Sequence, residues 1–66
     1  MRDPKRIDKF CDEFRSIWKG KVPDWRFGQL ISNFEYWLKG KGIDMFFPEE
    51  KEMLRLLKEF LGVNED

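Results

Sequence analysis

The chain has 66 residues, with 13 Lys or Arg balanced by 13 Asp or Glu, seven Phe, three Trp, one Tyr, a single Cys and no His. This length fits one small domain, residues 1–66, and the lone cysteine excludes an internal disulfide. Without histidine or further cysteines the common zinc sites are excluded as well, and we expect neither a metal nor a cofactor. Burial of the aromatic rings, each worth about 1.5–3 kcal/mol, is the expected source of stability.

The charges are spread unevenly along the chain. Residues 1–21 carry a net +3, residues 22–42 a net +1 and residues 43–66 a net −4. A chain of this kind has no strong electrostatic attraction to nucleic acid or to an anionic membrane. There is no apolar run of membrane-spanning length and no signal peptide, and a lone cysteine fits a reducing compartment. We therefore expect a cytoplasmic protein that does not bind membranes.

The first expected helix covers residues 4–19. Asp3 and Pro4 combine a capping acceptor with a proline at the first helical position, and a lysine followed by Gly20 ends the helix. Apolar residues recur between these ends at the spacing of one helical face: Ile7, Phe10, Cys11, Phe14, Ile17 and Trp18. Because Cys11 belongs to this face, we expect a buried structural thiol.

The second expected helix covers residues 24–39. It follows Pro23, begins at Asp24 as the capping residue and stops at Gly40. Its apolar face comprises Phe27, Leu30, Ile31, Phe34, Trp37 and Leu38. The two helices share an ending of lysine, glycine and lysine. We interpret it as a sequence that is common at helix ends rather than as an internal repeat.

A short apolar connector, residues 43–47, precedes the third expected helix, residues 48–61. The connector is either an extended segment or an additional helical turn, and the rings of Phe46 and Phe47 are expected to plug one end of the core. Gly62 ends the third helix, and residues 64–66 are expected to fray. Three amphipathic helices joined by short segments predict an all-α fold, a compact three-helix bundle with roughly antiparallel neighbours.

Catalytic chemistry finds little support in this sequence. No histidine is present to act as a base, so Ser-His and Cys-His pairs are excluded. The clustered carboxylates fit a solvated surface and favourable positions near helix N-termini, and the glycines are scattered rather than grouped into a phosphate-binding loop. We expect no catalytic residues and no enzymatic activity.

The outer side of the second helix is unusual because its polar groups are mostly uncharged. The residues that share this side are Trp25, Gln29, Ser32, Asn33 and Tyr36. Aromatic rings are enriched at protein interfaces, and amides can satisfy one another across a twofold axis. We interpret this side as a contact surface for a second copy, forming a homodimer, or for another protein. The competing interpretation is that Trp25 packs on the first helix and the other residues are ordinary polar surface.

DNA binding is the alternative function. Arg26, Gln29 and Asn33 lie along one side of the second helix, and these side-chain types read base edges. A recognition helix normally has phosphate-binding Lys and Arg around it. The pairs Lys19/Lys21 and Lys39/Lys41 follow different helices, and the acidic third helix is expected to approach one of them. Nucleic acid therefore ranks behind protein as the expected partner.

Part of the chain carries a recognisable pattern of residues. It consists of Arg2-Asp3-Pro4, Arg6-Ile7, Trp18, Pro23-Asp24, the run Arg26-Phe27-Gly28-Gln29-Leu30-Ile31, and Asn33. The pattern resembles a family of short uncharacterised prokaryotic and phage-borne proteins, and it is more distantly similar to the YihD-like bacterial proteins. The resemblance covers residues 2–33, and beyond them only Phe46-Phe47 ahead of Glu49-Glu50. It implies a small, mostly helical cytoplasmic protein and no particular activity.

Overall fold

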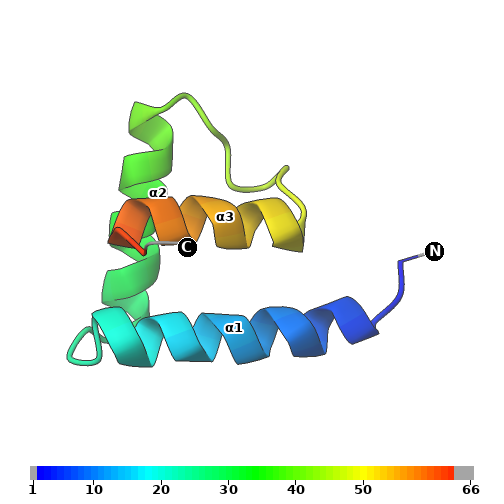
Figure 1. Ribbon diagram of the computed structural model, residues 1–66. Helices are drawn as coiled ribbons and strands as arrows, with labels where there is room; N and C mark the ends of the chain where they lie inside the picture. Colours follow the sequence, from blue (N-terminus) through cyan, green and yellow to red (C-terminus); the bar gives the residue numbers. More distant parts are fainter. Residues whose placement is uncertain (1, 64–66) are drawn as a thin grey trace.

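The computed structural model describes residues 2–63, and within them the chain forms three helices and no strand. The helices are α1 (Lys5–Lys21), α2 (Phe27–Gly40) and α3 (Glu50–Leu61) (Figure 1). The predicted all-α three-helix bundle is therefore confirmed. The predicted frayed tail, residues 64–66, lies outside the described residues.

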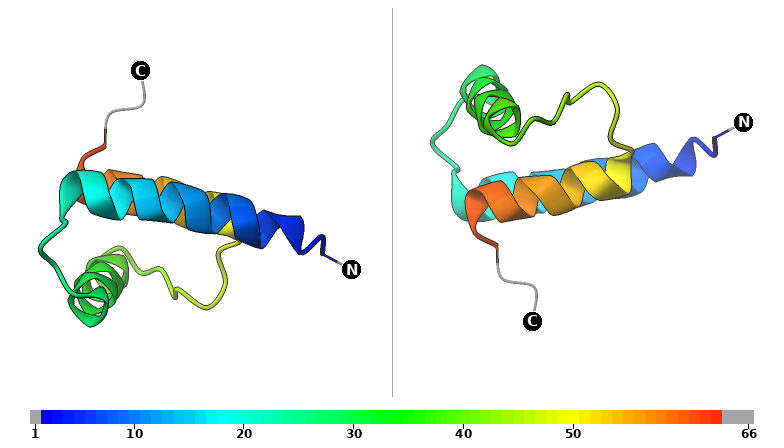
Figure 2. Two further views of the ribbon diagram at one scale, coloured as in Figure 1. Left: turned by 90° about the horizontal axis from the view of Figure 1, so that it is seen from below. Right: turned by 90° about the horizontal axis from the view of Figure 1, so that it is seen from above.

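The helices are not arranged as the expected antiparallel neighbours. α1 and α3 lie side by side and run in the same direction, while α2 crosses them (Figure 1). Views from above and below show α2 and the connector on one face of the layer that α1 and α3 form (Figure 2). The turn after α1 leads into α2, which crosses the layer. The long connector then brings the chain back to the start of α3, the end that lies away from this turn. α2 consequently covers only part of α1.

The helix boundaries follow local hydrogen bonds. The carboxylate of Asp3 accepts the N–H of Lys5 at 2.9 Å, as expected for a capping acceptor. α1 continues through Gly20 and ends two residues later than predicted, where the N–H of Val22 donates to the carbonyl of Trp18 at 3.1 Å. Glycine was expected to stop this helix, but a glycine also tolerates the helical conformation at a modest cost.

α2 begins three residues later than predicted. Residues 23–25 form a turn, and the helix starts where the N–H of Arg26 donates to the side-chain oxygen of Gln29 at 3.2 Å. This bond satisfies one of the free donors at the helix start, so Gln29 takes the capping role predicted for Asp24. α3 begins two residues later than predicted and ends, as expected, at Gly62 in the left-handed conformation with φ of 70°.

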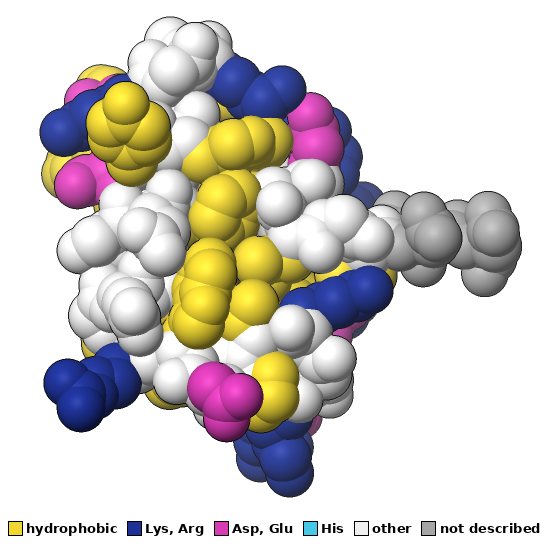
Figure 3. Space-filling view, turned by 90° about the vertical axis from the view of Figure 1, so that its left-hand side faces the viewer, with side chains coloured by type: hydrophobic (Ala, Val, Ile, Leu, Met, Phe, Trp, Pro, Cys, Tyr) yellow, Lys and Arg dark blue, Asp and Glu magenta, His cyan; other side chains and the backbone are white. Residues whose placement is uncertain are grey.

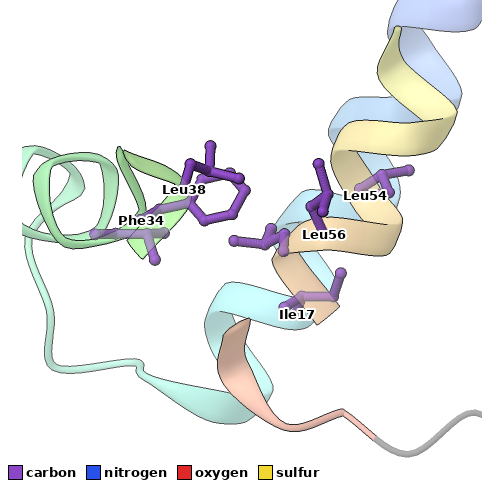
Figure 4. Close-up of a cluster of buried hydrophobic side chains, with 7 residues drawn as sticks. Ile17, Phe34, Leu38, Leu54 and Leu56 are labelled. Atoms are coloured by element: carbon purple, nitrogen blue, oxygen red, sulfur yellow. The ribbon is translucent and has the colours of Figure 1, made fainter. Parts of the chain in front are cut away.

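The core is small and lies mainly between α2 and α3. Leu30 and Leu38 of α2 are completely buried. Figure 4 shows Phe34 and Leu38 facing the side of α3 that carries Leu56. The buried set comprises Ile17, Leu30, Phe34, Leu38, Leu54, Leu56 and Leu57. α1 contributes a single member of this set because α2 crosses it instead of lying along it.

Two burial predictions are wrong. Cys11 is exposed, because it lies outside the part of the apolar face of α1 that packs against the core, to which Phe10, Ile17 and Trp18 belong. Phe46 and Phe47 do not plug the core but are 82% and 75% exposed. The connector is neither strand nor helix: it forms a turn, and Ile43 and Met45 supply its packing against the core.

Candidate functional site

The five residues predicted for the contact surface do not all reach the same place. Trp25 is half-buried, and Gln29, Ser32, Asn33 and Tyr36 are exposed. Trp25, Asn33 and Tyr36 border a common hollow, which we call the aromatic groove. Gln29 and Ser32 lie outside it. The prediction therefore identified one side of the groove and included two neighbours that do not border it.

The aromatic groove has a volume of about 590 Å³ and lies between α2 and the last turn of α3. It is lined by Trp25, Asn33, Tyr36, Trp37, Gly40, Lys41 and Phe60. Figure 3 shows hydrophobic side chains gathered in a band down this face of the molecule, with uncharged atoms beside them. A concave, largely apolar surface with a few polar groups at its edge is the usual form of a binding site.

Phe60 is the residue around which the groove is built. Its ring centroid lies 5.5 Å from that of Trp37, 5.6 Å from that of Phe34 and 6.4 Å from that of Trp25. These separations are typical of favourable aromatic pairs. Phe34 is buried beneath the groove, so the half-buried rings of the groove pack on the core.

Trp25 is held in place from two directions although it lies outside any helix. Its ring packs against Phe60 of α3, and its carbonyl accepts the indole N–H of Trp18 of α1 at 3.0 Å. Trp25 therefore contacts α1 through its backbone and α3 through its ring. Because both contacts fix the same turn, the groove wall is preorganised.

Lys41 occupies one end of the groove. Its ammonium lies 4.8 Å from the centroid of the Trp37 ring and 2.9 Å from the carboxylate of Glu59. The hydrogen bond from Lys41, with the positive charges of Lys41 and Arg55, holds the pKa of Glu59 below its ordinary value of 4.5, against the opposing effect of desolvation. The charge at this end of the groove is thus matched by a counter-charge.

Trp37 and Phe60 were missed as site residues because their spacing placed them in the apolar faces of their helices. Both are in fact half-buried, at the edge of the core. Which edge of an apolar face stays uncovered depends on how the helices cross, and helical spacing carries no information about this crossing. Tyr36 next to Trp37 was the one available signal, since it places an aromatic ring just outside the core face.

The alternative DNA-contact residues are all exposed, but the lysines at the end of their helix, Lys39 and Lys41, are paired with carboxylates. The side-chain oxygen of Gln29 is engaged at the helix start, and Asn33 borders the aromatic groove. Lys41 pairs with Glu59 of α3, as expected from the acidity of that helix, and Lys39 lies 4.0 Å from the carboxylate of Glu35. Phosphate contacts depend on basic side chains that are free to neutralise them.

Within residues 2–63, no three Cys, Asp or Glu side chains come together as a potential metal-binding group. None of the helices in this part of the chain combines the length and hydrophobicity needed to cross a bilayer. Comparison of the chain with protein-family models, with curated proteins and with solved structures found no match. The resemblance to YihD-like and phage-borne proteins accordingly stays an expectation from the sequence.

Proposed function

We propose that this protein is a non-enzymatic interaction module that self-associates, and that the aromatic groove between α2 and α3 is its contact surface. The proposal rests on one observation, namely that Trp25, Trp37 and Phe60 form a preorganised apolar hollow that residues 2–63 leave unfilled. Aromatic residues dominate the energetics of protein interfaces, where they sit in desolvated pockets. We expect this module to act in the cytoplasm.

The size of the core supports a second copy as the occupant. Only seven of the described residues are buried apolar side chains, whereas five large hydrophobic residues are exposed. A domain of this length buries about 60% of the surface of its unfolded chain and is marginally stable alone. Oligomerisation is one of the few ways in which a chain without disulfide or metal stabilises itself. Covering the groove with a second copy would remove several of its rings from water.

The border of the groove also suits a protein surface. Tyr36 is 82% exposed and Asn33 lies beside it on α2, so an aromatic ring and an amide flank the apolar floor. Interfaces between proteins typically have an apolar centre surrounded by polar groups and contain few charges at the centre. Among residues 2–63, Lys41 is the single charged residue that borders the groove.

Sedimentation velocity of the wild type and of Tyr36→Glu tests this function. The wild type is expected to form a dimer or larger species, and a new carboxylate in the apolar contact is expected to weaken association at least tenfold. Ser16→Glu places the same charge on an exposed position of α1 that does not border the groove, and it should associate like the wild type. Far-UV circular dichroism checks that both variants keep their helices. A monomeric wild type, or equal effects of the two substitutions, would rule the function out.

A further inference from the structure

The connector presents a pair of aromatic rings to solvent. Phe46 and Phe47 are 82% and 75% exposed, and their ring centroids lie 5.1 Å apart in an edge-to-face arrangement. Asp44 fixes the turn that carries them: its carboxylate accepts the N–H of Phe46 at 2.9 Å, and its carbonyl accepts the N–H of Phe47 at 3.2 Å. Two large apolar side chains are therefore held outward together by the backbone, and we call them the ring pair.

We propose that the ring pair of one copy inserts into the aromatic groove of a second copy. The proposal rests on the self-association proposed above and identifies the segment that fills the groove. The ring pair and the groove are two apolar features that the described residues leave in contact with water as organised groups. Edge-to-face and offset contacts between aromatic rings are favourable, so a groove walled by Trp25, Trp37 and Phe60 suits two phenylalanine rings.

The chain cannot fill its own groove in this way. Phe47 lies three residues before α3, whereas Phe60 lies in the last turn of that helix. The length of α3, about 1.5 Å per residue over 12 residues, separates the ring pair from the groove. The connector runs from the end of α2 to the start of α3, so its last residues, which carry the ring pair, lie at the end of α3 away from its last turn (Figure 1). A ring pair in the groove must therefore come from another molecule.

Size and charge agree with this occupant. Cavities that hold organic groups of moderate size measure about 300–1,000 Å³, and the groove, at about 590 Å³, falls within this range. Asp44 stands beside the ring pair, and Arg26 follows Trp25 at the groove wall; both are exposed. Neither side chain forms an ion pair among the described residues. Insertion would bring opposite charges to the edge of the contact.

The contact joins two different surfaces, so it can be tested by complementation. The variant Phe46→Ala/Phe47→Ala lacks the ring pair but keeps the groove, and Tyr36→Glu has a damaged groove but an intact ring pair. Each variant alone is expected to sediment as a monomer, with self-association at least tenfold weaker than in the wild type. An equimolar mixture is expected to form a heterodimer, because one intact ring pair meets one intact groove.

The outcomes separate this inference from the function on which it rests. A wild type that associates, is weakened by Tyr36→Glu and is unaffected by loss of the ring pair would overturn the inference and leave the groove as the interface. Two monomeric variants whose mixture also stays monomeric would overturn it too. Ile7→Ala removes another exposed apolar side chain, on α1, and serves as the control that should associate normally. A monomeric wild type would overturn both proposals.

Discussion

Two hollows of about 590 Å³ border α3, and different types of residue line them. The seam between α1 and α3 is lined mainly by charged side chains that pair across it, Arg6 with Glu50 and Lys58 with Glu13. The aromatic groove is lined by rings, and its one charged residue pairs with Glu59 at the edge. Volume alone does not distinguish the two. The groove is the better candidate because aromatic rings line it, whereas the charged side chains of the seam pair with one another.

The path of α2 explains this difference. α2 crosses the α1–α3 layer near the last turn of α3, so its rings meet Phe60 there. Toward the start of α3, the layer is bordered by the connector, and the neighbouring positions of α1 and α3 carry paired charges. α3 therefore has an aromatic environment where α2 crosses its last turn, and ion pairs on the side that faces α1.

The largest expected effect comes from removing the ring shared by the groove walls. Phe60→Ala is expected to lower the free energy of unfolding by about 2–3 kcal/mol, somewhat less than for a fully buried Phe because Phe60 is only half-buried. Urea denaturation followed by circular dichroism measures the loss. Phe47→Ala is the same substitution on an exposed ring, and the monomer should lose less than about 0.5 kcal/mol. Equal losses would mean that the groove is not supported by the core.

Much of the fold could be predicted from the sequence because the apolar spacing that indicates a helix is local in the sequence. Apolar spacing identified three helices, and the buried residues Leu30, Phe34 and Leu38 of α2 were all assigned to its inner side. The exposure of Cys11 could not be predicted in the same way. It depends on which part of the apolar face of α1 the other helices cover, and this is set by packing between segments distant in sequence.

The candidate site was predictable only in part, at Trp25 and at two residues of α2. Asn33 and Tyr36 stood out because uncharged polar and aromatic residues occupied a position where charge is usual. Phe60 did not stand out, because an aromatic residue at the spacing of an apolar helix face is assigned to the core whether or not a neighbouring helix covers it. Phe46 and Phe47 were predicted to be buried from hydrophobicity alone, but the turn that Asp44 forms with the backbone directs them outward.

A smaller effect is expected in the charged seam. Arg6→Gln removes the ion pair with Glu50, in which both side chains are about one-third exposed, and should cost less than about 1 kcal/mol of unfolding free energy. The difference from the wild type should shrink in high salt, which screens exposed charges. Arg15→Gln, whose partner Asp12 lies on the same helix, is the matched control and should cost still less. A loss as large as that of Phe60→Ala would contradict the contrast between the two hollows.

The smallest expected effect is a change in stability at acidic pH, caused by the ion pair between Lys41 and Glu59 at the groove. Lys41 lowers the pKa of Glu59 in the folded state, so this contact stabilises the fold above about pH 4.5, where the carboxylate is charged in both states. As the pH falls below 4.5, the unfolded chain binds the proton first, and the stabilisation is lost once the pH passes through the lower folded pKa. Lys41→Met should therefore be slightly less stable than the wild type at neutral pH, and the gap in unfolding free energy should close in acid. Lys39→Met makes the same substitution beside Glu35, at 4.0 Å from its carboxylate and away from the groove, and should show a smaller change with pH. A gap for Lys41→Met that is constant across this range would show that Lys41 acts through its packing on Trp37 rather than through its charge.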